Sequence, residues 1–285
     1  MKSIIPAFAL LLLSLAVEAA DLQQKDVEVY GLNIHYAEAG NGPTIVLLHG
    51  LWGGLNEWLP VVDKLGERHR VIAMDFIGFH GSDKPDTQYH NALLSQFLAG
   101  FMEALDLDDV TLVGHAMGAN AATYSAVHHP GRIARLVLID GAGYRNPDRD
   151  LSKPPSQGML GFRRVATGSS LLATRGLLER RVLDTSLVTD RWVEEAFGLW
   201  VNSAGAIGDM LLEGGDLTAE EMQRIHLPTL IVWGAEDKVF SIDNVARLRA
   251  DIAGSEAVIV ENSGHLPQLE QTGAFLNAVT NFLSQ

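Results

Sequence analysis

The chain has 285 residues, of which 47% are hydrophobic, a composition that suits one globular domain with an insertion and excludes a disordered chain. Its formal net charge of -14 argues against a nucleic-acid partner, because phosphate contacts need clustered Lys and Arg. It contains no cysteine, which excludes disulfides, a thiol nucleophile and thiolate-bound zinc.

Residues 1–19 have the pattern of a secretory signal peptide. Lys2 supplies the positive start, residues 4–17 are almost wholly apolar, and residues 17–19 form a small-residue cleavage site. A transmembrane anchor is the alternative, but a spanning helix needs about 20 apolar residues and this stretch is shorter. We therefore expect an exported protein, periplasmic or secreted, with no stable membrane insertion after signal cleavage.

Apolar segments rich in Val, Ile and Leu recur along the chain and predict strands buried on both faces. They are Thr44 to Leu48, Arg70 to Met74, Val110 to Val113, Leu136 to Ile139, Thr229 to Trp233 and Ala257 to Val260. Helical patterns between them cover residues 58–65, 92–105, 119–128, 244–252 and 273–283. This alternation predicts an α/β fold with a mostly parallel sheet and helices on both faces. Residues 27–30 and 32–38 flank Gly31 and predict an antiparallel hairpin at the sheet edge.

The alternation stops after Asp140 and resumes at Thr229, and proline-containing helical stretches fill the interval. We therefore expect a helical lid over residues 143–226, inserted into a core of residues 20–142 and 227–285. One apolar helix face of the lid comprises Val193, Ala196, Phe197, Trp200 and Val201. Core packing explains this face, and an apolar roof over a substrate is the functional alternative.

The segment Gly114-His115-Ala116-Met117-Gly118 follows a buried strand and precedes a helix rich in small residues. Its two glycines suit a sharp strand-to-helix turn that leaves no room for side chains. The segment resembles a nucleophile elbow, in which the residue at the tip of the turn attacks the substrate. Here that position holds Ala116, whose methyl group cannot form a covalent intermediate.

Further segments lie in the order expected for the α/β-hydrolases, a family that this chain resembles over essentially its whole mature length. Residues 47–54, Leu-Leu-His-Gly-Leu-Trp-Gly-Gly, are similar to the family's His-Gly oxyanion loop. The resemblance implies that the backbone N–H groups of Leu51 and Met117 form an oxyanion hole. It also implies neighbouring oxyanion or substrate contacts from His49, Gly50 and Trp52.

The family's acid and histidine have matches after two late strands. Asp237, in Trp-Gly-Ala-Glu-Asp, matches the acid, and His265, in Asn-Ser-Gly-His-Leu-Pro, matches the catalytic histidine. The resemblance implies that Asp237 orients the imidazole of His265. Asp140, at the end of an earlier strand, is the alternative acid, and Glu236 matches the acid position less well than its neighbour.

Residues 75–85 also resemble a loop of this family, with His80 where glycine is usual. Because no ligand set lies near His80 in the sequence, we expect a solvated loop residue. No spaced cluster of histidines and carboxylates predicts a metal site, and no cofactor is expected.

Three functions are compatible with Ala116. In the first, His265 is the general base toward water or a substrate proton and the two amides hold developing negative charge. Family members with alanine at this position, similar to the aminoacrylate hydrolase of pyrimidine breakdown, fit this description. In the second, alanine replaces the serine of an ordinary serine esterase. In the third, the chain binds a small ligand without catalysis.

The expected substrate or ligand is a small, largely apolar, uncharged or weakly charged carbonyl compound, because the expected lid contains aromatic residues and the oxyanion loop suits a carbonyl oxygen. Hydrolysis is the reaction class that fits best. Decarboxylation, elimination and cofactor-free oxygen chemistry use the same base and cavity.

Overall fold

The computed structural model describes residues 22–145, 156–167, 170–213 and 215–285. The predicted signal peptide and its cleavage site therefore lie outside the described residues. Within these ranges no helix combines the length and the apolar character that crossing a bilayer requires.

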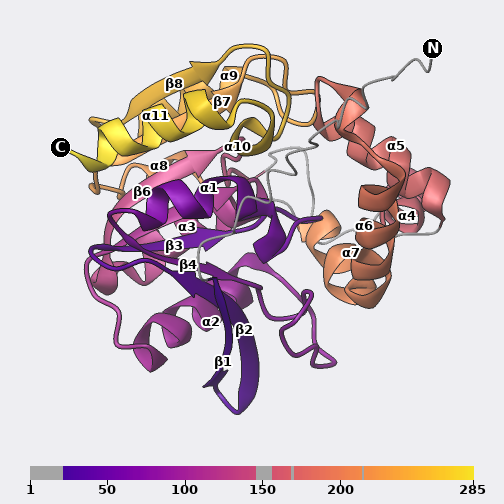
Figure 1. Ribbon diagram of the computed structural model, residues 1–285, viewed down its shortest axis with the longest axis horizontal. Coiled ribbons are helices and arrows are strands. Elements are labelled where there is room, and N and C mark those ends of the chain that lie inside the picture. The colour runs from indigo at the N-terminus through magenta and orange to yellow at the C-terminus, as the bar shows by residue number, and fades with distance from the viewer. Residues whose placement is uncertain (1–21, 146–155, 168–169, 214) are drawn as a thin grey trace, which may run out of the picture.

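An eight-stranded sheet forms the centre of the molecule, in the order β1-β2-β4-β3-β5-β6-β7-β8 (Figure 1). The strands are β1 Gln23–Val29, β2 Leu32–Ala39, β3 Thr44–Leu48, β4 Arg70–Met74, β5 Val110–His115, β6 Ile133–Ile139, β7 Thr229–Gly234 and β8 Glu256–Val260. Strands β3 to β8 pair in parallel, whereas β1 pairs with β2 and β2 with β4 in antiparallel fashion. The predicted parallel sheet and its edge hairpin are confirmed.

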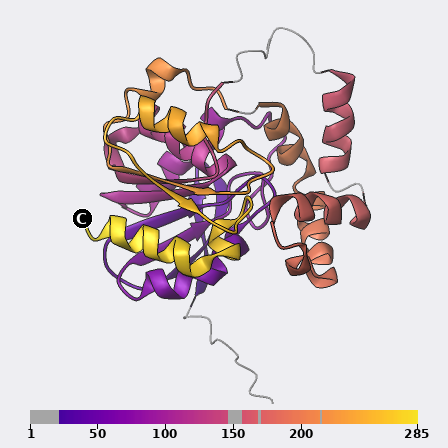
Figure 2. The same cartoon turned by 90° about the horizontal axis from the view of Figure 1, so that it is seen from above.

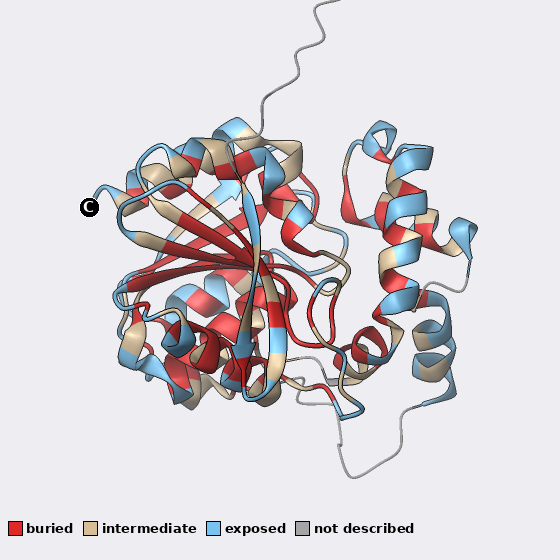
Figure 3. Cartoon of the chain, turned by 60° about the horizontal axis from the view of Figure 1, so that its bottom comes forward, coloured by how far each residue is buried: buried red, intermediate tan, exposed pale blue. Residues whose placement is uncertain are grey.

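Helices cover both faces of the sheet, as the alternating sequence pattern predicts (Figure 2). One face packs against α1 Leu59–Gly66 and α11 Thr272–Leu283, which contribute side chains such as Val62 and Phe275 to the same apolar cluster. The other face packs against α2 Asn91–Ala104, α3 Met117–His128, α8 Ala219–Met222 and α9 Asp243–Asp251. The central strands are consequently buried on both sides, which explains their uninterrupted apolar sequences (Figure 3).

Further helices follow β6 and lie beside the end of the sheet where the parallel strands terminate (Figure 2). These inserted helices are α4 Gln157–Ala166, α5 Leu171–Arg181, α6 Asp190–Asn202 and α7 Ala204–Glu213. Ser156, Ser170 and Thr189 begin three of them by accepting hydrogen bonds from backbone amides of the first turn. This placement brings the insertion over the loops that carry the elbow and the histidine.

The apolar face predicted for α6 is narrower in the structure. Val193, Ala196 and Trp200 are buried, but Phe197 is partly exposed and Val201 is 49% exposed. The prediction was wrong for Val201 because each helical residue turns by about 100 degrees from the previous one. Val201 therefore lies outside the buried face, on which Trp200 is the last residue.

Candidate functional site

The elbow is a tight turn between β5 and α3, with Ala116 at its tip. Ala116 has φ 48° and ψ -108°, a conformation that side-chain-bearing residues rarely adopt. A Cβ at Gly118 would collide with the backbone oxygen of Leu48, and one at Gly114 would collide with the turn itself. The two glycines are thus required by close backbone approach, and the fold imposes the strained conformation on an alanine.

His265 faces this turn from the loop after β8. Its Nδ1 lies 2.8 Å from Oδ2 of Asp237, and the two side chains are 3% and 0% exposed. Because Nδ1 donates to the carboxylate, the neutral ring carries its lone pair on Nε2. His265 and Ala116 line the same cavity of about 330 Å³. The imidazole therefore borders the space next to the Ala116 methyl group.

Burial sets the charges of this pair. It lowers the pKa of His265 to about 4, and the hydrogen bond to Asp237 offsets this only in part. Burial acts to raise the pKa of Asp237, yet the hydrogen bonds from His265 and from two backbone amides hold it below its ordinary value. At neutral pH the site therefore contains an ionised carboxylate and a neutral imidazole that can accept a proton.

Asp140 lies next to Asp237, and among the described residues it is Asp237, not Asp140, that is hydrogen-bonded to the imidazole. It is fully buried, and its Oδ1 accepts a 2.9 Å hydrogen bond from the backbone N–H of Gly234. Burial and the adjacent charge of Asp237 raise the pKa of Asp140 well above its usual range, which favours its protonated, neutral form. Glu236 points elsewhere and accepts from the backbone N–H of Ser263 at 3.1 Å.

Asp140, Asp237 and His265 have potential ligand atoms within 4.8 Å of one another, the spacing of a metal site. The hydrogen bond between His265 and Asp237, together with the position of Asp140 next to the same carboxylate, accounts for this proximity. The arrangement consists of an imidazole, a carboxylate hydrogen-bonded to it, and a second carboxyl group whose pKa is raised.

The two predicted oxyanion amides belong to residues that line the Ala116 cavity, Leu51 and Met117. Met117 begins α3, where backbone N–H groups lack partners within the helix. In the part of the chain that the structure describes, neither of these amides donates to a protein acceptor. Both are therefore available to an oxygen atom in the cavity.

The other residues of the oxyanion loop have different positions. Trp52 lines the cavity, whereas His49 and Gly50 do not. His49 is fully buried, donates from Nδ1 to the carbonyl of Gly50 at 2.7 Å and accepts at Nε2 from the N–H of Phe76 at 3.2 Å. Both of its nitrogens are satisfied, so His49 shapes the loop from within the core.

A buried polar cluster beneath this loop was not predicted. His115 Nδ1 lies 2.6 Å from Oε1 of Glu57, and its Nε2 lies 2.8 Å from the carbonyl oxygen of His265. Oε2 of Glu57 lies 3.6 Å from the guanidinium of Arg181, and Gln268 donates to Oε1 at 3.0 Å. The cluster connects the elbow, the histidine loop and α5. Only the place of His115 in the elbow signals it in the sequence.

The charges of this cluster are mutually dependent. Burial acts to raise the pKa of Glu57, but the adjacent His115 and Arg181 lower it to about 2. Burial lowers the pKa of Arg181, and Glu57 opposes this. Removing Glu57 would leave the buried guanidinium of Arg181 without this carboxylate partner, which is strongly destabilising.

His80 contradicts its prediction as a solvated residue. It is half-buried with φ 42°, its Nε2 contacts the carbonyl oxygen of Gly53, and its ring packs 5.6 Å from that of His49. Its backbone N–H donates to Ser203 at 3.1 Å. Its positive φ lies at the position where glycine is usual, and its ring supports the oxyanion loop.

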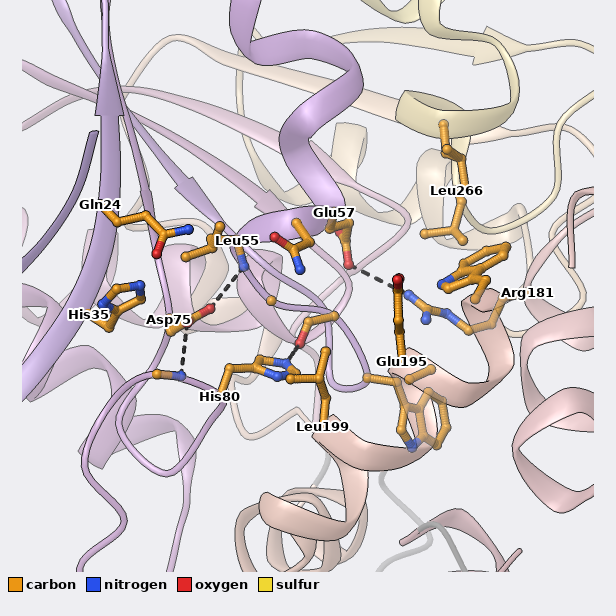
Figure 4. Close-up of a pocket in the computed structure, with 18 of the residues that line it drawn as sticks. Gln24, His35, Leu55, Glu57, Asp75, His80, Arg181, Glu195, Leu199 and Leu266 are labelled. Atoms are coloured by element: carbon orange, nitrogen blue, oxygen red, sulfur yellow. Dashed lines mark hydrogen bonds and ion pairs between the residues drawn. The ribbon is translucent and has the colours of Figure 1, made fainter. Parts of the chain in front are cut away.

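A second cavity of about 680 Å³, shown in Figure 4, lies next to the first, because the linings of the two cavities share Trp52 and Arg181. Its wall includes apolar side chains of α6, such as Leu199, and the buried carboxylates of Glu57 and Asp75. Asp75 already accepts hydrogen bonds from the amides of Leu55 and Gly81 at 2.9 and 3.1 Å.

Comparisons with known proteins agree with this fold. A family model described as alpha/beta hydrolase fold matches residues 43–272, and the chain belongs to this family. The chain is 30% identical over 287 residues to 2-hydroxy-6-oxononadienedioate/2-hydroxy-6-oxononatrienedioate hydrolase of Escherichia coli, with 94% of this chain and 97% of the relative covered. It is 26% identical over 272 residues to 2-hydroxy-6-oxo-6-(2'-aminophenyl)hexa-2,4-dienoic acid hydrolase of Metapseudomonas resinovorans, with 92% and 91% covered.

A solved structure is also similar. It is that of a meta-cleavage product hydrolase from Pseudomonas fluorescens, a serine-to-alanine mutant complexed with acetates. The TM-score is 0.79 at 25% sequence identity, with 92% of this chain and 98% of the other covered. By name, the two curated relatives are hydrolases of oxo-substituted organic acids, and the protein of the solved structure is a meta-cleavage product hydrolase.

Proposed function

We propose that this protein hydrolyses a small, largely apolar carbonyl compound without forming a covalent intermediate. The observation that supports this most strongly is the set of groups around the Ala116 methyl. A neutral His265 is paired with an ionised Asp237, and the amides of Leu51 and Met117 lack protein acceptors in the described part of the chain.

In the proposed reaction, a water molecule lies in the cavity between His265 and the substrate carbonyl. His265 Nε2 takes a proton from the water as its oxygen bonds to the carbonyl carbon. The carbonyl oxygen gains the negative charge and accepts hydrogen bonds from Leu51 and Met117. As the tetrahedral intermediate collapses, the imidazolium returns the proton to the leaving group, and Asp237 stabilises the transient positive charge.

A serine esterase with its nucleophile replaced by Ala116 is the second candidate. One observation favours it: Ala116 keeps the strained φ 48° and ψ -108° of an elbow, although a methyl group makes no use of that conformation. A noncatalytic binding protein is the third candidate, and it requires neither the oriented dyad nor the unpaired amides.

The substrate class follows from the cavity and from the relatives. The wall contains apolar side chains from the inserted helices and the oxyanion loop, including Leu51, Phe162, Leu177 and Met210. The compounds named for the two curated relatives carry oxo groups, and the carbonyl carbon of an oxo group is an electrophile. We propose that activated ketones, esters or thioesters with an apolar substituent are the substrates of this chain.

The direct test is turnover of short activated esters, thioesters and oxo acids by the protein and by His265→Ala. Loss of the base should lower kcat by a factor of about 100 or more. His128→Ala is the matched control, because His128 is exposed at the end of α3 and does not line the cavity, so its rates should be unchanged. Equal rates for the parent and His265→Ala, or no turnover of any compound in the panel, would favour the noncatalytic binding protein.

We also propose that residues 143–226 form a lid over a core of residues 20–142 and 227–285, and that the chain is exported. The lid is supported by Phe162 and Leu177, which α4 and α5 contribute to the cavity. Export rests on the pattern of residues 1–19 alone. Cell fractionation with the measured mass of the mature protein tests it, and a cytoplasmic, uncleaved chain would contradict it.

A further inference from the structure

Helix α4 exposes its apolar side chains. Met159, Phe162 and Val165 recur every three residues along one stripe and are 37%, 45% and 43% exposed, and Ala166 is the one buried residue of α4. The next helix begins with Leu171 and Leu172, at 46% and 81% exposed. A surface helix normally turns its apolar stripe toward the core. Among the residues that the structure describes, none gives this stripe the cover that such a surface usually has.

The same segment is basic in an acidic protein. Residues 156–181 contain five of the 21 basic residues and one of the 35 acidic residues of the chain. Arg163 and Arg175 are paired with Asp209 and Asp190 at 3.3 and 2.5 Å. By contrast, Arg164 and Arg180 are exposed and, among the described residues, lack a carboxylate partner. These two guanidinium groups give the exposed surface a positive charge.

The entrance to the Ala116 cavity belongs to this surface. Phe162, Arg180 and Phe240 line the cavity and are also exposed, Phe162 at 45% and Phe240 at 41%. Arg180 donates to the carbonyl of Lys238 at 3.3 Å, which connects α5 to the loop that carries Phe240. The exposed stripe of α4 and the mouth of the cavity thus meet at Phe162.

We propose that this docking face, comprising Met159, Phe162, Arg164, Val165, Leu171, Leu172, Arg180 and Phe240, binds the surface of an anionic lipid bilayer. A bilayer accepts exposed apolar side chains at the boundary of its acyl chains, while its anionic headgroups pair with arginines. The exposed arginines select an anionic partner, although the molecule as a whole carries a charge of -14. The contact is peripheral and reversible because a single short stripe enters the interface.

Docking places the cavity entrance at the lipid surface. A largely apolar carbonyl compound dissolved in the bilayer would then enter past Phe162 without crossing water. This consequence rests on the proposed function, whereas docking itself does not.

The first test uses the absence of cysteine in the chain. Met159→Cys and, as control, Glu103→Cys on the exposed side of α2 are each labelled with an environment-sensitive fluorophore. Vesicles rich in phosphatidylglycerol should shift the emission of the label at 159 to the blue and leave that at 103 unchanged. High salt or pure phosphatidylcholine should reduce the shift. A shift at both positions or at neither overturns the proposal.

The second test compares vesicle co-sedimentation of the full chain with that of single variants. Val165→Asp should lower partitioning onto phosphatidylglycerol vesicles by about tenfold, because a carboxylate replaces an inserted side chain. Tyr30→Asp is the matched control at an apolar residue that is 60% exposed on the β1-β2 hairpin, and it should bind as the parent does. All three proteins share residues 1–21, so a difference between them reports on the docking face.

Two further measurements separate the outcomes. Turnover of a short water-soluble ester by Val165→Asp should equal that of the parent, since Val165 does not line the cavity. If neither protein hydrolysed the ester, the proposed function would be contradicted, but the result of the vesicle experiment would still be valid. Sedimentation velocity tests for a second copy on this face: a dimer that Val165→Asp dissociates, with unchanged vesicle binding, overturns the proposal.

Discussion

The indole Nε1 of Trp200 donates a 2.8 Å hydrogen bond to the backbone carbonyl of Trp52. The indole of Trp52 in turn donates to the carbonyl of Ala166 at 3.0 Å. Helices α4 and α6 are thereby bonded to the residue that follows Leu51. The position of one proposed oxyanion amide consequently depends on the inserted helices as well as on the core of the fold.

Trp200→Phe should impair catalysis through this connection. The variant removes the donor and leaves the carbonyl of Trp52 without its partner, which should lower the free energy of unfolding by about 1 kcal/mol. Misplacement of the Leu51 amide should lower kcat by about tenfold with a smaller effect on KM. Trp192→Phe, at a partly exposed tryptophan of the same helix, is the control for steady-state kinetics and urea unfolding. An unchanged kcat in Trp200→Phe would show that the hydrogen bond does not position the amide.

Ala116→Ser should gain a reactive hydroxyl at the elbow tip. With His265 in the same cavity and both oxyanion amides available, the serine should be labelled by a fluorophosphonate and give a burst of product from activated esters. The parent should show neither. Adding His265→Ala to the serine variant should abolish labelling. A correctly folded serine variant that stays unlabelled would contradict the substituted-esterase reading.

The pH profile should report the lowered pKa of His265. The base acts in its neutral form, and burial lowers its pKa to about 4, so kcat/KM should be flat near neutral pH and fall as pH drops through about 4. The same ring titrates in a nitrogen-15 NMR experiment, which needs no substrate. A limb near the ordinary histidine value in both measurements would contradict the assignment of the base.

Asp140→Asn should make the protein increasingly more stable than the parent as the pH rises. Because the pKa of Asp140 is raised in the folded protein, the folded state binds more protons than the unfolded state above the ordinary value of 3.8. Stability from this group is present at low pH and is lost as pH rises, by about 1.4 kcal/mol per pH unit until the folded pKa is reached. The asparagine variant avoids this loss, so its advantage in urea unfolding should grow with pH.

Asp237→Asn is the matched control for that experiment. The pKa of Asp237 is lowered in the folded state, so its contribution is present above pH 3.8 and is lost on acidification. Its asparagine variant should therefore be less stable than the parent at neutral pH. If the stability of both variants relative to the parent changed with pH in the same direction, the two carboxyl groups could not have pKa values shifted in opposite directions.

Local patterns predicted the sheet and the positions of the elbow, Asp237 and His265. A strand buried on both faces has a continuous apolar sequence, and a tight turn needs glycine, so both are visible within a few residues. The cluster of Glu57, His115 and Arg181 had no such pattern, because three distant segments supply one group each. Pairing across segments is a property of the folded chain.

The resemblance to the family's motif also predicted more contacts to substrate from the oxyanion loop than the cavity lining contains. His49 has the position of a substrate contact in the sequence, yet its two nitrogens bond to Gly50 and Phe76 inside the core. The side chain of His80 turns inward for a similar reason, since the turn at its positive φ directs the ring against the loop. Sequence shows which residues a loop contains, but the backbone path determines which side chains reach a cavity.

The strained turn at Ala116 has a genetic consequence. Every alanine codon becomes a serine codon through one base change, and the elbow already has the backbone shape that a serine there would need. No second substitution is required to build the turn, the base or its orienting carboxylate. If the proposed function holds, a single point mutation would therefore exchange water-dependent for covalent chemistry in a population carrying this gene, without an unfolded or reshaped intermediate protein.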